Sequence, residues 1–246
     1  KLDLFNEQVQ NYLLNLYSDL AKYPVDGILF QDDLILSHTE GFTEAALHKY
    51  RNDFSEELVP NNLFTKHGFE GKKIPGDIYT YKFWKWVDWK AKFLLDAAAK
   101  IRDTVKKVNP GIAFGLNCYY EDILFPDRAL AWSSHDLKEA QRYGFDYFFI
   151  MLYHRQMKKE LVLNEKRLTR ILKSFPWCLS QIIKDTNKAV IKIQTMDWET
   201  KEPIHDSEID KIYKLIVRNR NMGLVFVPYR EDMDLELLRK YFFRGI

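Results

Sequence analysis

The chain is poor in cysteine. Its 246 residues contain two, Cys118 and Cys178, which lie far apart and show neither a CxxC motif nor a Cys/His ligand spacing. This scarcity excludes the dense disulfide framework of small secreted domains and gives no indication of a zinc site. The sequence leaves open one disulfide between the two residues.

A strong excess of one charge is also missing. The 37 basic and 35 acidic residues are spread along the chain and give a formal net charge of +2. A nucleic-acid-binding surface is usually strongly basic, so no nucleic-acid partner is expected. No apolar run of the printed sequence is long enough for a transmembrane segment, and its residues show no signal-peptide pattern, as expected for a portion of a longer protein.

Motifs that hold phosphates, dinucleotides or metals are absent as well. No GxGxxG or GKS/T follows an expected strand, which argues against nucleotide cofactors. His38, His48 and His67 occur among acids in a long connection, without HExxH or another compact ligand pattern. We therefore predict neither a metal nor a cofactor.

What the chain does have is length and aromatic residues. A chain of 246 residues can bury a large core, and α/β barrels of this size form one domain, so residues 1–246 are predicted to be a single domain. Aromatic residues make up 15% of the sequence. Most of them are expected in the core, although flat rings also cover the apolar faces of sugars.

Apolar runs typical of buried strands alternate with helical periodicity. The expected strands are 27–30, 112–117, 147–152, 189–195 and 224–228. The expected helices are 9–20, a long one from Asp77 to 105, 136–143, 167–173, 177–184, and one that begins with Asp206 or Ser207 as its N-cap and carries Ile209 to Val217. This alternation predicts an α/β protein with a parallel sheet and helices outside it. An unusually long connection, 34–76, separates the first strand from the long helix, and such connections in barrels build the active-site face.

The first expected strand ends on two adjacent carboxylates, Asp32 and Asp33. Alpha/beta barrels place their catalytic groups at the carboxyl ends of strands. Neighbouring side chains on a strand point to opposite faces, so one aspartate would face a pocket while the other orients a loop. The alternative is a pair of solvated turn aspartates, which the chemistry alone makes equally plausible.

The stretch DGILFQDDLILS around this pair resembles the C-terminal glycoside hydrolase domain of bacterial poly-β-1,6-N-acetyl-D-glucosamine N-deacetylases. Further landmarks of that family follow in the same order: Leu13 to Tyr17, Lys85-Trp86, Lys90, Asn117, Ile193-Gln194, Asp197-Trp198, Pro203 and Pro228 to Asp232. The resemblance implies a (β/α) barrel of the TIM type. It begins just before the family's fourth strand, so the barrel is expected to be incomplete, with about five of eight strand–helix units and an edge strand at Gly27. The chain is accordingly expected to be the C-terminal part of a longer protein, or a naturally shorter open sheet.

The resemblance implies glycoside hydrolysis, which needs one carboxyl group to protonate the leaving oxygen and a second to act as nucleophile or base. Asp32 and Asp33 are the expected catalytic residues and the source of the acid. The second carboxylate is not identifiable, and the N-acetyl group of the substrate can replace it. Gln31 departs from the histidine that the family often has before the aspartates.

Polar and aromatic side chains at the other strand ends are the expected substrate-binding residues. They are Asn117, Tyr119, Tyr153, His154, Gln194, Trp198 and Tyr229. The amides suit hydrogen bonds to sugar hydroxyl or acetamido groups, and the rings suit stacking, as do Tyr120 and Trp132. The alternative for each amide and for the histidine is a purely structural role. Trp84, Trp86 and Trp89 follow helical spacing and are expected to be packing residues.

Two function classes therefore remain. The first is an endo-glycosidase that cleaves partially de-N-acetylated poly-β-1,6-N-acetyl-D-glucosamine, and the second is a non-catalytic module that binds the same polymer for a deacetylase domain. In both, the resemblance implies an N-terminal deacetylase domain in the full-length protein. It also implies a periplasmic or outer-membrane-associated location in a Gram-negative bacterium.

Overall fold

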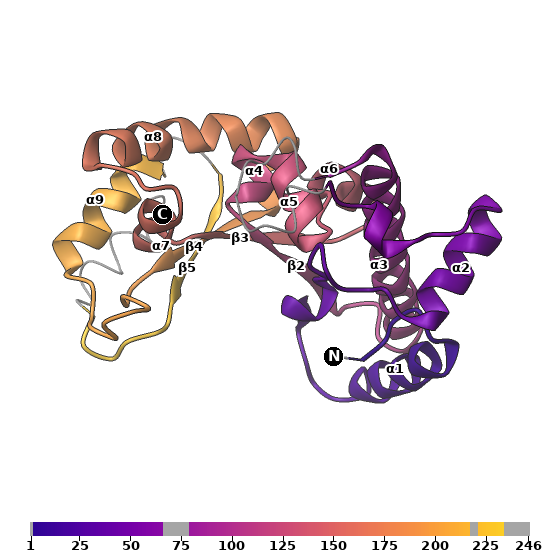
Figure 1. Cartoon of the computed structure of the whole chain (residues 1–246). Helices are drawn as coiled ribbons and strands as arrows, with labels where there is room; N and C mark the ends of the chain where they lie inside the picture. Colours follow the sequence, from indigo (N-terminus) through magenta and orange to yellow (C-terminus); the bar gives the residue numbers. More distant parts are fainter. Residues whose placement is uncertain (1, 66–78, 217–220, 234–246) are drawn as a thin grey trace. The chain divides into compact units, whose positions relative to one another are not determined.

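The computed structural model describes residues 2–65, 79–216 and 221–233 (Figure 1). The chain divides into two compact units. The first contains Lys1–Asn117 and Phe125–Asp146, and the second contains Cys118–Leu124 and Tyr147–Ile246.

The first unit begins with helix α1 (Glu7–Leu20) and strand β1 (Gly27–Phe30). Its further helices are α2 (Glu44–Phe54), α3 (Tyr81–Val108), α5 (Pro126–Ser133) and α6 (Leu137–Ala140), and its 3-10 turns are η1 (Asp32–Leu34), η2 (Pro60–Asn62) and η4 (Gln141–Tyr143). Strand β2 (Ala113–Tyr119) begins in this unit, and its last two residues belong to the second unit. Strands β1 and β2 are parallel, with a register that runs from Gly27 opposite Ala113 to Phe30 opposite Leu116. Within the described residues β1 pairs with β2 alone, which confirms the expected edge strand.

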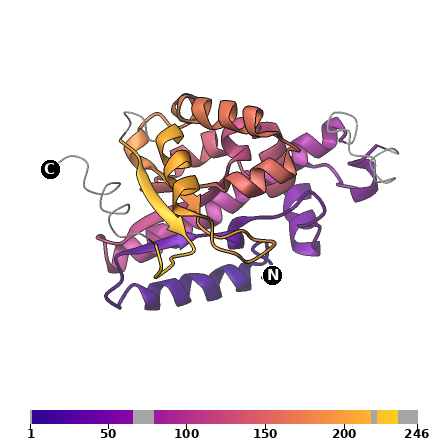
Figure 2. The same cartoon turned by 90° about the vertical axis from the view of Figure 1, so that its left-hand side faces the viewer.

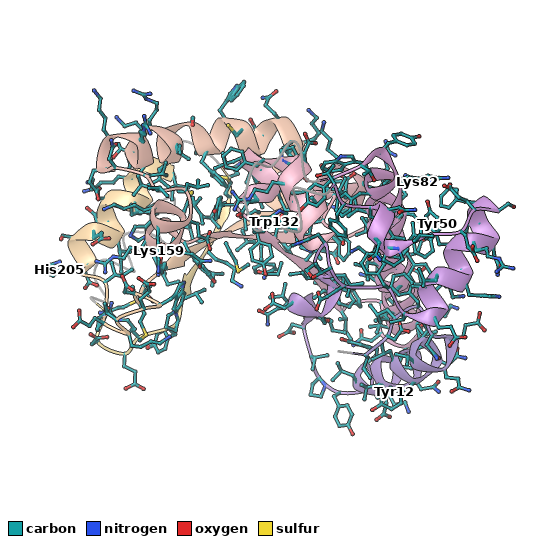
Figure 3. All side chains as sticks on the ribbon, in the orientation of Figure 1. Tyr12, Tyr50, Lys82, Trp132, Lys159 and His205 are labelled. Atoms are coloured by element: carbon teal, nitrogen blue, oxygen red, sulfur yellow. The ribbon has the colours of Figure 1, made fainter. Side chains whose placement is uncertain are left out.

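Helix α3 forms the centre of this unit because its apolar residues recur every three or four positions. Phe83, Trp86, Val87 and Trp89 are all buried in one core cluster. Tyr50 of α2, labelled in Figure 3, packs in an edge-to-face arrangement with Trp86 and Trp89, with 5.5 and 5.4 Å between the ring centroids. The packing role expected for the helical tryptophans is confirmed, with Trp84 partly buried at the rim of the cluster.

The long connection after β1 has secondary structure of its own, which the sequence reading did not predict. It contains η1, α2 and η2, and an isolated bridge joins Phe64 to Tyr79. Thr43 caps α2 by accepting a hydrogen bond from the Ala46 N–H, so the local signal for this helix was present in the sequence. His67 and Asp77 lie outside the described residues.

The second unit is built on three parallel strands, β3 (Tyr147–Leu152), β4 (Ala189–Gln194) and β5 (Gly223–Val227). Its other elements are α4 (Glu121–Leu124), α7 (His154–Glu160), α8 (Glu165–Ile182), η5 (Thr186–Lys188) and α9 (Asp206–Ile216). Helices α8 and α9 lie side by side, and α9 also packs against β4 (Figure 2). Strand ends agree with the sequence prediction to within one or two residues.

Two helix predictions in this unit were wrong. Helix α8 continues through Pro176 as one element, because Leu168, Leu172, Phe175 and Leu179 form one buried stripe that spans the proline. Helix α9 already includes Asp206, so neither Asp206 nor Ser207 is its N-cap. The carbonyl of His205 accepts the first helical hydrogen bonds, and its ring Nδ1 accepts from the Ser207 N–H. The expected helical residue Val217 lies outside the described residues.

Cys118 and Cys178 do not form a disulfide with each other, and both are thiols. Burial raises the pKa of the Cys118 thiol well above its ordinary value. None of the helices in the described ranges combines the length and apolar character needed to cross a bilayer.

Candidate functional site

Asp32 and Asp33 follow the carboxyl end of β1, as expected, with Gln31 between them and the strand, and both side chains are exposed. They do not lie on the strand, which ends at Phe30. Gln31 turns the chain, with φ −109° and ψ −125°, and the two aspartates begin the 3-10 turn η1. The expected alternation between opposite faces of a strand therefore does not apply. The surroundings of Asp32 and Asp33 differ because of the 3-10 turn and the hydrogen bond that Asp33 makes in it.

Asp33 is directed back toward its own backbone. Its Oδ1 accepts a hydrogen bond of 2.7 Å from the Gln31 N–H. The residue also borders a cavity of about 450 Å³, together with Tyr17 and Phe30. Burial raises the pKa of the Tyr17 hydroxyl, and the negative charge of Asp33 raises it further. Asp32 is not part of this cavity wall.

Asn117 lies in the same unit, near the end of β2. The residue before it, Leu116, stands opposite Phe30, so the parallel register brings Asn117 to the edge where β1 ends. Its side chain is only 2% exposed. The position agrees with the expected strand-end amide, and its contact with substrate stays a prediction.

His38 lies among aromatic side chains rather than among metal ligands. Its ring centroid is 5.8 Å from that of Trp132 and about as far from Phe64 and Tyr79. Trp132, labelled in Figure 3, lies on α5 and not in a loop after a strand. The Arg128 guanidinium lies over its ring, with Cζ 4.9 Å from the centroid. Among the described residues no three His, Cys, Asp or Glu side chains gather closely enough to hold a metal ion.

The second unit contains the remaining predicted binding residues. Tyr119 is the last residue of β2, and its N–H donates to the buried Asp122 carboxylate at 2.6 Å. The ring edge of Tyr153 meets the Trp198 ring at 5.3 Å between centroids and an interplanar angle of 69°. Tyr229 follows β5 and is 72% exposed, so its ring is open to a ligand.

Gln194 and His154 are buried and have partners within the protein. The Gln194 Oε1 accepts from the Arg155 N–H at 3.2 Å, and its Nε2 donates to the Met196 carbonyl at 2.8 Å. His154 begins α7 and pairs through Nε2 with Glu208 of α9 at 2.8 Å. Both side chains therefore have a structural role, which the sequence analysis gave as the alternative. Their contact with substrate is an untested prediction.

The sequence reading missed Arg155 and Glu208, which link α7 to α9. Arg155 forms a two-pronged pair with Glu208 at 3.0 and 2.8 Å, and donates a third hydrogen bond to Asp197 at 3.0 Å. His154 and Arg155 hold the pKa of Glu208 well below its ordinary value, and Arg155 lowers the pKa of Asp197. Asp197 is thereby an ionised acceptor rather than a proton donor. Arg155 follows the predicted Tyr153-His154 pair directly, but its partner lies 53 residues away.

The expected convergence of Asn117, Gln194, Trp198 and Tyr229 stays a prediction. Asn117 belongs to the first unit and the other three belong to the second.

Comparison with known proteins places the chain in a family. The model described as hypothetical glycosyl hydrolase family 13 matches residues 1–227. This chain belongs to that family. The resemblance indicated by the sequence motifs is thereby confirmed, and the glycosyl-hydrolase-like classification of the chain is shown.

Two curated relatives carry the name poly-beta-1,6-N-acetyl-D-glucosamine N-deacetylase, from Escherichia coli K12 and from Escherichia coli O157:H7. Each is 23% identical over 201 residues, which are 81% of this chain and 27% of the relative. The chain thus spans about a quarter of the length of these relatives.

The solved glycoside hydrolase domain of PgaB (BpsB) from Bordetella bronchiseptica matches with a TM-score of 0.76 at 20% identity. The match covers 98% of this chain and 64% of that domain. It confirms the expected fold, a partial (β/α) barrel with five parallel strands among the described residues.

Proposed function

We propose that this chain is an endo-glycosidase that cleaves partially de-N-acetylated poly-β-1,6-N-acetyl-D-glucosamine. The observation that carries the proposal is the exposed acidic pair at the carboxyl end of β1, in a chain of a glycosyl hydrolase family. The curated relatives named for this polymer supply the substrate class.

Asp32 is the proposed acid and Asp33 its orienting neighbour. One Asp33 oxygen accepts from the Gln31 N–H, so this carboxylate stabilises the turn that carries both residues. Asp32 donates its proton to the leaving glycosidic oxygen as the bond from that oxygen to C1 breaks. Water then adds at C1 and leaves a hydroxyl group there, and its released proton returns to the Asp32 carboxylate. The acetamido oxygen of the sugar can assist at C1, which would explain why no second carboxylate stands out.

Substrate recognition is proposed to use the exposed Tyr229 and the Tyr153–Trp198 ring pair for stacking, together with Tyr119 at the end of β2. His154 and Gln194, which lie in the same unit, are proposed to support these contacts through their polar groups. Asn117 is proposed to contact the polymer from the end of β2 in the first unit. The mechanism uses neither a metal nor another cofactor. The proposed partner within the full-length protein is an N-terminal deacetylase domain, and the proposed location is the periplasm or the outer membrane of a Gram-negative bacterium.

The test is incubation of the protein with partially de-N-acetylated polymer, followed by mass spectrometry of the soluble oligomers. We expect a ladder of short oligomers that grows with time. Fully acetylated polymer is the matched control for substrate choice. If the protein retains the polymer on a column without releasing oligomers, the glycosidase proposal is wrong and the chain is a polysaccharide-binding module.

A further inference from the structure

Lys90 occupies a position where an apolar side chain would be expected. It lies in the middle of α3, one turn from Trp86 and one turn from Leu94, which are both buried. Its side chain is 0% exposed. An ammonium group in such a place costs a large desolvation free energy unless it is hydrogen-bonded.

The ammonium group is hydrogen-bonded to the loop that follows the acidic pair in the chain. Its Nζ donates to the carbonyl of Ser37 at 2.8 Å and to the carbonyl of Glu40 at 3.1 Å. The same turn is closed by the Glu40 N–H on the Ser37 carbonyl at 3.0 Å and by the Ser37 N–H on Glu40 Oε2 at 2.8 Å. Lys90 thus satisfies carbonyls at both ends of a turn that starts four residues after Asp33.

The loop also rests directly on the lysine stem. Gly41 has φ +88°, and a Cβ at this position would lie 3.1 Å from Lys90 Cδ and 3.4 Å from Leu36 Cδ1. The same loop is held a second time by Ser134, whose Oγ donates to the Leu36 carbonyl at 2.7 Å. A buried charge, a close backbone approach and a second side-chain anchor therefore act on four residues of the loop 36–41, namely Leu36, Ser37, Glu40 and Gly41.

We propose that Lys90 is a positioning residue for Asp32, because it fixes the loop that continues from the turn carrying the acidic pair. This inference rests on the proposed glycosidase function. Lys90 has no part in the reaction itself, since its ammonium is enclosed and used by two carbonyls. Its effect comes through geometry, and a displacement of about 1 Å in a catalytic group can lower the rate roughly 100-fold.

The first test compares Lys90→Met with Lys92→Met. Methionine keeps the length and apolar stem but cannot donate to the carbonyls. Lys92 lies two residues further along the same helix, is 49% exposed and pairs with Asp88, so its replacement controls for loss of a lysine from α3. We expect Lys90→Met to lower kcat about 100-fold with KM changed less than about threefold, because the acid moves while the binding residues stay in place. Lys92→Met should retain the wild-type kcat.

Hydrogen exchange supplies a readout that is independent of activity. In Lys90→Met the amides of residues 31–42 should exchange at least about tenfold faster, since the loop loses two hydrogen bonds to a charged group. Amides of β4 should keep their protection. Faster exchange throughout the chain would indicate a general folding defect and would overturn the specific role.

A second variant approaches the same contact from the loop. Gly41→Ala places a methyl group against the Lys90 stem and leaves the core of α3 unchanged. It should reproduce the loss in kcat, and the double variant should lose less than the product of the single effects, because both act on one contact. If Lys90→Met does not fold, the kcat of Gly41→Ala alone tests whether the contact between Lys90 and the loop positions Asp32.

The outcomes separate the two proposals. If the wild-type protein releases no oligomers, the glycosidase proposal fails and this role of Lys90 fails with it. If the wild type cleaves the polymer and both Lys90→Met and Gly41→Ala retain full kcat, the positioning role alone is overturned.

Discussion

Asp32 and Asp33 are neighbours in sequence but differ in what their carboxylates contact. Asp33 folds back onto the Gln31 N–H and borders an apolar cavity with Tyr17, whereas Asp32 lies outside that cavity. The two aspartates at the end of the first strand were enough to predict a catalytic acid there from the sequence. The proposed division of roles depends on the 3-10 turn, which the strand pattern did not predict.

Replacement of the two aspartates should therefore have unequal effects. Asp32→Asn should lower kcat by about 10²–10⁴-fold, the usual contribution of a general acid. Asp33→Asn should retain activity within about tenfold, because the amide oxygen still accepts from Gln31, whereas Asp33→Ala removes the acceptor and should lose more. Initial rates of oligomer release measure both, and thermal unfolding confirms that the variants are folded. Equal losses in the two Asn variants would contradict the proposed division.

Lys90 should make stability depend on pH above neutrality. Burial lowers its pKa to about 7, against the opposing influence of the Glu40 carboxylate. An unfolded chain holds this proton up to its ordinary pKa near 10.5, so between pH 7 and 10.5 the unfolded state binds more protons. Stability should therefore rise with pH in this window, by at most about 1.4 kcal/mol per pH unit.

Urea unfolding of the wild type and of Lys90→Met from pH 6 to 9.5 measures this effect. The wild type should gain stability relative to the variant above pH 7, and the difference should be constant below it. His38 also faces Lys90, but burial and the lysine charge lower its pKa, so it titrates below the window. Parallel curves for the wild type and Lys90→Met would contradict the lowered pKa.

Among the elements, α7 and α9 are joined by charges rather than by apolar packing alone. Glu208 of α9 accepts from both His154 and Arg155 of α7, and Arg155 also reaches Asp197. These charge-assisted bonds are partly exposed, so solvent screening reduces their contribution.

Glu208→Gln should lower the free energy of unfolding by about 1–2 kcal/mol at neutral pH. The pKa of Glu208 is held below its ordinary value of 4.5 in the folded protein, so this stabilisation is complete above pH 4.5 and is lost as the pH falls further. Denaturant unfolding at pH 7 and at pH 3 measures the change. Glu199→Gln, which removes an exposed pair with Lys159, is the control and should have little effect at either pH.

At the scale of the whole molecule, the chain was predicted to be one domain, and its structure contains two compact units. One domain requires that the units unfold together. The variants Trp86→Ala and Glu208→Gln test whether the units unfold together, because Trp86 belongs to the core of the first unit and Glu208 belongs to the second unit.

Differential scanning calorimetry should show one transition that both variants shift downward. Trp86→Ala should cost about 3–5 kcal/mol, and each kcal/mol lowers Tm by roughly 2–4 °C in a chain of this size. Glu208→Gln should move the same transition by a smaller amount. Two separate transitions, each moved by only one variant, would contradict the single-domain prediction.

The sequence by itself determined the positions of the strands, the packing role of the tryptophans of α3 and the family. These follow from local information, since apolar periodicity depends on neighbouring residues and motif order depends on the chain alone. Only the tertiary structure decided that α8 passes through Pro176, that Asp33 turns back onto Gln31, and that Arg155 meets Glu208. In the sequence Lys90 was only one of the landmarks of the family resemblance, because its partners Ser37 and Glu40 lie 53 and 50 residues away. Such pairs depend on which distant segments the fold brings together, and periodicity along the sequence carries no information about that.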